Sequence, residues 1–512
     1  MTKTVELDMP VVTRSLLTKN SILNVSSQFI PLLVTFFTVP YIVAHLGMER
    51  FGIFAIVRVM IDYFTIFDLG LGVATTRFIA NSLGNKDNLN ISRIYWTLIL
   101  LVTCLGVIAA SLFYLFVPVL SARVFIISSN LLPEIIAVSM IASPLILFLL
   151  VKSVLTGTVQ AYQRFDLFNM VNVPNLIFSA IVPVFVLMRG GGLKEIIIWL
   201  VLVEFVFLLI WYIVSLSIIP YRKFQGLLRP ALLKEVVSYG SWLLVQRISN
   251  WILCNVHTVI LGILVSVSAI GYYSIPYTLA SKIGLIGAGI MPVIFPAASL
   301  FDGKDIEKSR RLFHGSLKYI ILLYGLACLI LFVFAKEILI LWVGDAFIKS
   351  VFVTQLLAVS VFLNGISWIF IIFTQVNNPR FVSIVSFVQT FCYLLLLWFL
   401  TKSFGFVGAG YAWFFLSLST IVIFGLYSIK SKCMPKLLNI DMRFTYAAGY
   451  LTAILLLNNI IKHFNGVNVP GVILNMMLLV SGYTVIAWVF FVDSEQKDAI
   501  SLIVRKSLAV KR

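Results

Sequence analysis

The sequence predicts an all-α, polytopic membrane protein with about fourteen transmembrane helices, arranged as two similar six-helix bundles followed by two further helices. Composition, recurring apolar runs and an internal repeat lead to this prediction. Of the 512 residues, 61% are hydrophobic and 11% are charged, and the mean hydropathy is +1.06. Charged residues make up about a quarter of an ordinary soluble domain. We therefore expect an integral membrane protein.

Apolar runs recur along the whole chain. Each is long enough to cross a hydrocarbon core of about 30 Å as a helix of roughly 20 residues. The first twelve runs form the two six-helix repeats, and the last two are additional. The expected helices cover residues 18–45, 51–80, 94–117, 132–158, 166–188, 195–219, 236–265, 268–300, 313–335, 350–375, 380–401, 406–429, 444–461 and 470–492.

The second half of the chain repeats landmarks of the first half about 217 residues later. Gly47 corresponds to Gly262 in the second half, and Gly52 corresponds to Gly271. Leucine- and glycine-rich segments resemble one another by composition alone, but the nearly constant offset favours a true duplication. Two repeats in the same orientation are typical of carriers that rock two halves about a central site. The predicted parts are a first lobe, a cytoplasmic linker, a second lobe, two additional helices and a basic cytoplasmic tail, at residues 1–219, 220–235, 236–430, 431–492 and 493–512.

Lysine and arginine fall mainly on one set of alternate loops, and cytoplasmic loops of membrane proteins carry this excess. The pattern predicts that both termini are cytoplasmic. The cations assigned to the cytoplasmic side include Lys86, Arg93, Lys152 and Arg164. The net charge of +18 then reflects topology and attraction to anionic membrane lipid, so no nucleic-acid partner is expected.

The motifs of common catalytic sites are missing. The sequence contains no GxxxxGK[ST] phosphate loop, no HExxH zinc pair and no CxxC motif. Every expected loop is also too short to hold a soluble catalytic or nucleotide-binding domain. We therefore expect neither an enzyme nor a protein with a bound metal or organic cofactor. The duplication favours a carrier over a channel.

Three cations are expected inside the membrane, namely Arg58, Arg247 and Lys282. A charge at the bilayer centre costs at least about 2.5 kcal/mol, so such residues are expected to face a cavity and to bind an anionic substrate. Structural alternatives exist for each. Arg58 can pair with Asp62 one turn away, Lys282 can pack against Ser281, and Arg247 can reach the cytoplasmic interface.

Polar residues form stripes on two helices that correspond to each other in the repeat. The first helix carries Asn24 and Gln28 one turn apart, and the seventh carries Arg247 and Asn250. A polar face on each helix, directed at the other, predicts a hydrophilic cleft between the two halves. The alternative is that these side chains form hydrogen bonds between packed helices.

Acidic residues at membrane depth are candidates for coupling to an ion, either H+ or Na+. Glu204 lies in the middle of its expected helix with no basic residue nearby in sequence, which makes it the first candidate. Asp62 is the second. Asp68 either couples an ion or caps the turn before Gly70 and Gly72.

Two stretches, residues 20–54 and 62–80, resemble the Wzx-type flippases of O-antigen and capsule repeat units. These flippases belong to the multidrug/oligosaccharidyl-lipid/polysaccharide exporter superfamily. The resemblance rests on the signatures P-Y-(x)n-LG-x-E-x-FG and DLGLG-x-(x)n-R. They are present as Pro40, Tyr41, Leu46, Gly47, Glu49, Phe51, Gly52, Asp68, Gly70, Gly72 and Arg77.

The resemblance implies ion-coupled transport of an undecaprenyl-pyrophosphate-linked oligosaccharide across the bacterial inner membrane, to the outer leaflet. A polysaccharide polymerase and a chain-length regulator are the implied partners. The alternative within the superfamily is a multidrug or metabolite cation antiporter, for which a cleft lined by carboxylates is expected. A membrane enzyme acting on lipid-linked sugar is a third reading, against which the short loops argue.

Overall fold

The computed structural model describes residues 14–68, 70–220, 252–301, 306–430 and 469–491, together with residues 224, 230 and 234. Within these ranges the chain is helical and contains no strand. Nine helical segments in the described part are long and apolar enough to cross a membrane. The chain divides into two compact units, residues 1–274 with 397–409, and residues 275–396 with 410–512.

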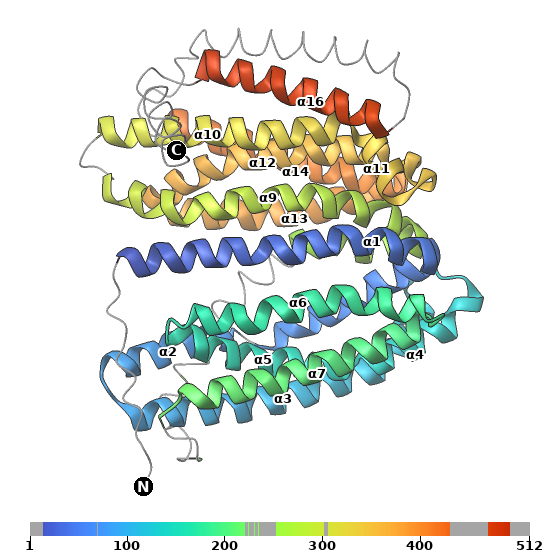
Figure 1. The fold of residues 1–512 in the computed structure, drawn as a ribbon, viewed down its shortest axis with the longest axis vertical. Helices are drawn as coiled ribbons and strands as arrows, with labels where there is room; N and C mark the ends of the chain where they lie inside the picture. Colours follow the sequence, from blue (N-terminus) through green and yellow to red (C-terminus); the bar gives the residue numbers. More distant parts are fainter. Residues whose placement is uncertain are drawn as a thin grey trace, which may run out of the picture. The chain divides into compact units, whose positions relative to one another are not determined.

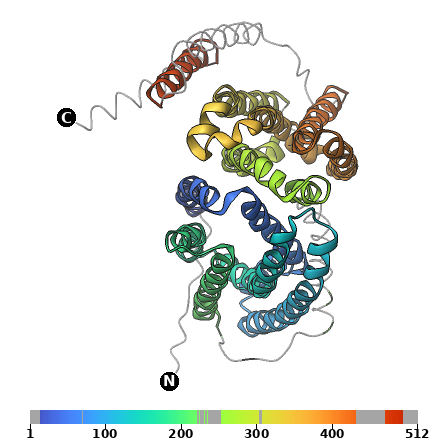
Figure 2. The ribbon, with the colours of Figure 1, turned by 90° about the vertical axis from the view of Figure 1, so that its right-hand side faces the viewer.

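The first unit begins with the long helix α1, and its helices lie side by side (Figure 1). Figure 2 shows the same helices nearly along their axes. The elements are α1 (Arg14–Phe64), η1 (Thr65–Asp68), α2 (Leu71–Gly84), α3 (Asn88–Arg123), η2 (Ser129–Leu131), α4 (Leu132–Ala142), α5 (Pro144–Ala161), α6 (Phe165–Met188), α7 (Leu193–Ile218), the helix Ile252–Leu264 and the beginning of α9 (Val267–Phe301).

The first two expected helices, 18–45 and 51–80, are divided differently in the structure. Instead of a loop between them, α1 continues to Phe64 and bends at Gly47, whose φ of 74° is open to glycine but strained for other residues. The expected single helix 51–80 is broken after Phe64 by the 3₁₀ turn Thr65–Asp68, and Gly70 before α2 has φ 74°. The prediction of a continuous helix over 51–80 was therefore wrong, because the glycines of DLGLG permit a break.

Helix α5 packs against α2, α3 and α7 in the first unit. Its approach to α2 is close because Gly157 faces the main chain of Gly72, leaving no room for a side chain. The Thr76 hydroxyl donates a hydrogen bond to the Gly157 carbonyl over 3.0 Å. Within lipid there is no hydrophobic driving force between helices. Small residues let membrane helices approach closely, and the packing and hydrogen bonds formed there stabilise the pair.

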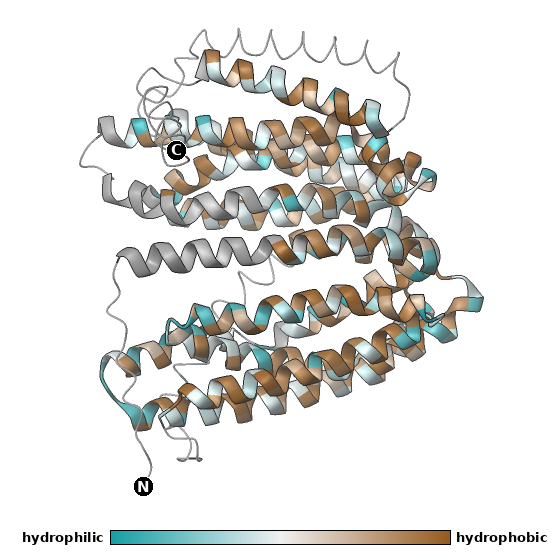
Figure 3. Ribbon diagram, in the orientation of Figure 1, coloured by the Kyte–Doolittle hydropathy of each residue, from teal (hydrophilic) through white to brown (hydrophobic). Residues whose placement is uncertain are grey.

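The composition of the helices is consistent with lipid on one side. Large apolar side chains of α7 such as Trp199, Phe205 and Ile213 are exposed on the surface of the unit. Helices α3 and α7 are mostly hydrophobic along their lengths, whereas the turn that joins α2 and α3 is hydrophilic (Figure 3). Exposed apolar side chains on spanning helices are what a hydrocarbon solvent requires.

A main-chain bridge links residues far apart in sequence near the bend of α1. The Ile126 N–H donates to the Gly262 carbonyl over 2.9 Å, and the Val267 N–H donates to the Ile126 carbonyl over 3.3 Å. A side chain at Gly52 would collide with the Val267 main chain. The bridge thus joins the segment after α3 to the turn before α9.

The signature residues beside this bridge form polar contacts of their own. Ser128 donates a hydrogen bond to Glu49 over 3.1 Å. Arg50 and Glu134 form an ion pair with an N–O distance of 3.0 Å. The LG-x-E-x-FG signature therefore contributes a bend, a carboxylate that accepts a hydrogen bond, and a glycine required by close packing.

The second unit contains the rest of α9 and the helices that follow it. A cluster around Phe313, Tyr324 and Phe373 forms part of its core. Near the end of the chain, the Tyr483 hydroxyl donates to the carbonyls of Ile321 and Leu322, which attaches the last described helix to α10. The elements are α10 (Ile306–Val333), α11 (Ala335–Val343), η3 (Asp345–Ser350), α12 (Val351–Asn377), α13 (Pro379–Phe404), α14 (Phe406–Lys430), α16 (Val469–Ile486) and η4 (Ala487–Phe491).

Most helices expected from the sequence agree with these bounds, α6, α7, α12, α13 and α14 closely. The expected helix 444–461 and the tail 493–512 lie outside the described residues, as do residues 236–251 of the expected helix 236–265 and nearly all of the linker 220–235. The division into lobes at 219 and 236 and the duplication itself stay predictions.

Candidate functional site: a buried polar cluster between three helices

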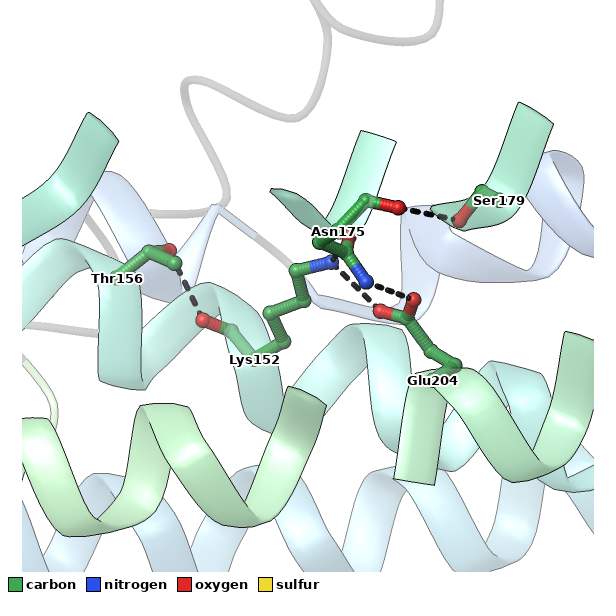
Figure 4. Close-up of polar contacts among 5 residues, drawn as sticks. All are labelled: Lys152, Thr156, Asn175, Ser179 and Glu204. Atoms are coloured by element: carbon green, nitrogen blue, oxygen red, sulfur yellow. Dashed lines mark hydrogen bonds and ion pairs between the residues drawn. The ribbon is translucent and has the colours of Figure 1, made fainter. Parts of the chain in front are cut away.

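Lys152, Asn175 and Glu204 form a closed ring of hydrogen bonds inside the first unit (Figure 4). The Lys152 ammonium group lies 2.6 Å from Glu204 Oε1 and 2.8 Å from Asn175 Oδ1. The Asn175 amide nitrogen completes the ring by donating to Glu204 Oε2 over 3.0 Å. We call these three residues the polar ring.

Each member of the polar ring comes from a different helix. Lys152 lies on α5, Asn175 on α6 and Glu204 on α7. On α7, Glu204 belongs to the buried face, where Ile197 and Trp211 lie seven residues before and after it. A spacing of seven residues, close to two turns, returns to the same side of a helix. The pattern of apolar residues on α7 therefore directs the carboxylate into the unit.

The polar ring is almost completely shielded. The side chains of Lys152 and Glu204 are 16% and 10% exposed, and Asn175 is buried. A buried ion pair is tolerated when further hydrogen bonds satisfy the remaining lone pairs and protons. Asn175 does this for both charged groups at once, since its amide accepts from one and donates to the other.

The sequence led to Glu204 but not to its partners. The distribution of cations places Lys152 on the cytoplasmic side, whereas in the structure it lies within a candidate membrane span, Ser129–Ala161. Sorting cations by loop cannot detect a lysine that pairs with a carboxylate from a distant helix. The expected helix 132–158 already contained Lys152, and this position was the signal available in the sequence.

A second polar group lies next to Lys152 along the chain. The Ser153 hydroxyl donates to Asp68 Oδ1 over 2.9 Å, and the Gly72 N–H donates to the same oxygen over 3.2 Å. Asp68 is buried. Its carboxylate thus accepts a hydrogen bond from the first turn of α2, which is the capping alternative for this residue.

The expected substrate-binding cations are placed as follows. Arg58 is exposed on α1, and its charge acts on Asp62, which is half-buried one turn later. Lys282 is exposed on α9 in the second unit, while the nearby Ser281 hydroxyl donates within its own helix to the Thr278 carbonyl. Whether Arg58 contacts substrate or pairs with Asp62 stays a prediction.

The side chains of the other expected substrate-binding residues lie outside the described part of the structure. Asn24 and Gln28 belong to α1, but their side chains lie outside the part of the chain that is described. Arg247 and Asn250 also lie outside it. Their roles in a polar cleft stay predictions. Among the described residues, no group of three or more His, Cys, Asp or Glu side chains is arranged to hold a metal ion.

Comparisons with known proteins agree with a transporter. A family model described as polysaccharide biosynthesis protein matches residues 17–301. Over 405 residues the chain is 22% identical to a Shigella flexneri protein named "Putative O-antigen transporter". That alignment covers 77% of this chain and 93% of the Shigella protein.

Solved structures share the fold at low sequence identity. The lipid II flippase MurJ in an inward closed conformation has a TM-score of 0.71 at 14% identity, covering 94% of this chain and all of the MurJ chain. An inward-facing MATE family multidrug resistance transporter of the MOP superfamily has a TM-score of 0.64 at 12% identity, covering 80% of this chain and 98% of that one. The expected all-α, multi-pass membrane fold is thereby confirmed.

Proposed function

Because the chain belongs to the polysaccharide biosynthesis protein family, we propose that it is a flippase for lipid-linked oligosaccharide. The proposed substrate is an undecaprenyl-pyrophosphate-linked repeat unit, moved from the cytoplasmic to the outer leaflet of the bacterial inner membrane by alternating access. The family match over residues 17–301 is the observation that carries this proposal. No covalent bond changes in such a step.

The charges of the chain support an anionic substrate. Arg58, Arg247 and Lys282 are the proposed partners of the pyrophosphate, as charge-assisted hydrogen-bond donors. Asn24, Gln28 and Asn250 are proposed to contact the glycan, while the polyprenyl tail stays in lipid. A membrane potential favours outward movement of an anionic head group by about 2.3 kcal/mol per charge per 100 mV. Coupling to H+ or Na+ at Glu204 or Asp62 would reset the carrier.

A multidrug or metabolite cation antiporter is the second candidate, because a MATE transporter shares the fold. Cationic substrates favour a cleft dominated by carboxylates. In the sequence, the candidates at membrane depth include the cations Arg58, Arg247 and Lys282. With Lys152 added from the span Ser129–Ala161, these cations outnumber the carboxylates Asp62, Asp68 and Glu204. The excess of cations favours the anionic substrate. A polymerase and a chain-length regulator remain the proposed partners.

The test measures translocation by the purified full chain in liposomes. The readout is the appearance of a fluorescent polyprenyl-pyrophosphate oligosaccharide in the outer leaflet. We expect wild type to translocate it. Hydrogen bonds to charged groups contribute about 1.5–3 kcal/mol each, so Arg247→Ala with Lys282→Ala should lower the rate about tenfold or more. Lys194→Ala with Lys336→Ala removes two exposed cations at helix beginnings and is the matched control.

Unchanged transport in the Arg247 and Lys282 variant would place the pyrophosphate elsewhere. If wild type moved no lipid-linked oligosaccharide but exported a cationic dye, the antiporter would replace the flippase. New glycosidic or phosphate bonds formed by the purified protein would support the hypothesis of a membrane enzyme.

A further inference from the structure

The polar ring of Lys152, Asn175 and Glu204 already contains a cation. We infer that Lys152 is the resident counter-ion of Glu204 and restricts coupling at this carboxylate to protons, excluding Na+. The inference rests on the proposed function for its transport readout, but its binding readout is independent of any substrate.

Each oxygen of Glu204 already accepts a hydrogen bond within the polar ring, and a cationic group occupies the position beside Oε1. Oε1 accepts from the Lys152 ammonium over 2.6 Å, and Oε2 accepts from the Asn175 amide over 3.0 Å. The Asn175 carbonyl oxygen is also used, at 2.8 Å from the ammonium group. Hard cations are held by several oxygen atoms. A sodium ion at Glu204 would have to displace a lysine of the same charge that is tethered beside it.

The charged groups nearest to the ring are few. Asp68, buried beside α5, accepts hydrogen bonds from Ser153 and Gly72. Lys152 is the only charged residue of α5, and the α6 sequence carries only Asp166 at its beginning, paired with Arg164 over 2.8 Å. On α1, Arg58 and Asp62 are one turn apart, Glu49 accepts from Ser128, and Arg50 pairs with Glu134. The remaining charges of α4 and α7 lie in the first turns of those helices and are Glu134, Lys194 and Glu195.

A proton can enter where a metal cation cannot, and it changes the ring. Both carboxylate oxygens face N–H donors, so protonation of either oxygen replaces a charged acceptor with a neutral one and weakens the hydrogen bonds of the ring. The cluster then passes from neutral to a net charge of +1. Because its members come from α5, α6 and α7, protonation of Glu204 loosens the contact among three helices. A local charge change of this kind biases a conformational equilibrium.

The test compares thermal unfolding of the purified full chain in NaCl and in KCl. We expect the same Tm in both salts for wild type. Lys152→Met leaves a carboxylate and an amide without the tethered cation, so Na+ can bind there. Because a bound ion stabilises the folded state, the Tm of this variant should be several degrees higher in NaCl than in KCl. Adding Glu204→Gln to this variant should abolish the rise, and the exposed-lysine control Lys194→Met should behave as wild type.

A sodium-specific rise in wild type that is lost in Glu204→Gln would overturn the inference, as would a folded Lys152→Met variant without the rise. If Lys152→Met does not fold, wild type in liposomes decides. Transport accelerated by an inward proton gradient and not by a sodium gradient supports the inference, and the reverse overturns it. A protein with the expected Tm pattern that moves no lipid-linked oligosaccharide would overturn the proposed function and leave the assignment of Lys152 supported.

Discussion

Lys152 and Glu204 depend on each other, because both charges are largely buried. Their side chains are 16% and 10% exposed, and they are 52 residues apart in sequence. Removing one partner of a buried pair leaves an uncompensated charge, whereas replacing both with neutral residues of similar size removes the desolvation penalty as well. The ring therefore stabilises the first unit through pairing.

Lys152→Ala is expected to lower the free energy of unfolding by about 3–5 kcal/mol, because Glu204 stays buried without its cation. Lys152→Met combined with Glu204→Gln should cost much less than the sum of the single changes. A double-mutant cycle of thermal stability in detergent measures this coupling.

The ion pair of Arg164 and Asp166 is the matched control, since it is of similar length but 34% and 58% exposed. Arg164→Ala should cost less than about 1 kcal/mol. A Lys152→Ala variant as stable as Arg164→Ala would contradict the structural account of the ring.

At the scale of elements, the break between η1 and α2 illustrates what the sequence could and could not predict. The glycines of DLGLG, with Asp68 before them, predicted a capped turn as one alternative, and the structure has it. The length of the apolar run predicted a continuous helix over 51–80, because hydropathy does not register a short 3₁₀ turn. Local signals were the better guide here, since the break depends on the backbone conformation of Gly70, whose φ is 74°, rather than on composition.

Asp68→Ala should destabilise the protein by about 1 kcal/mol, the usual effect of losing a cap. Asp68→Asn keeps an oxygen that accepts from Gly72 and Ser153, so its stability and transport should be close to wild type. Thermal unfolding and liposome transport measure both. Loss of ion coupling in a stable Asp68→Asn variant would instead assign this carboxylate to the coupling pathway.

The close packing of α2 and α5 gives a second test at this scale. A methyl group at Gly157 would meet the Gly72 main chain, so Gly157→Ala should cost about 1–3 kcal/mol of stability. Gly84, at the end of α2, has open space around the position of a side chain. Gly84→Ala should be neutral or should stabilise by up to about 1 kcal/mol. Equal effects of the two substitutions on Tm would contradict the close approach.

At the scale of the molecule, composition and the signatures were sufficient for the fold and the family, because a bilayer allows few solutions and hydropathy reports them directly. Pairing between helices was not accessible in the same way. Glu204 was recognised by its depth, but its contact with Lys152 and Asn175 depends on how α5, α6 and α7 rotate and pack. A single sequence carries little information about such rotations.

The predicted orientation can be measured with single cysteines in a cysteine-free background. Asn85 and Ser129 are exposed, at the end of α2 and at η2. With cytoplasmic termini, an impermeant maleimide added to intact cells should label Ser129→Cys and leave Asn85→Cys unlabelled until the membrane is opened. The opposite pattern would invert the topology and reverse the direction of transport proposed here.

The main-chain bridge at Ile126 has a consequence for mutagenesis. Because its two hydrogen bonds join backbone groups of Ile126, Gly262 and Val267, alanine scanning leaves every donor and acceptor of the bridge in place. A deletion between Arg123 and Ser128 would shift the register, and Ile126→Pro would remove one donor. Length and proline content, rather than side-chain identity, are therefore the properties that homologous chains would have to preserve along this segment.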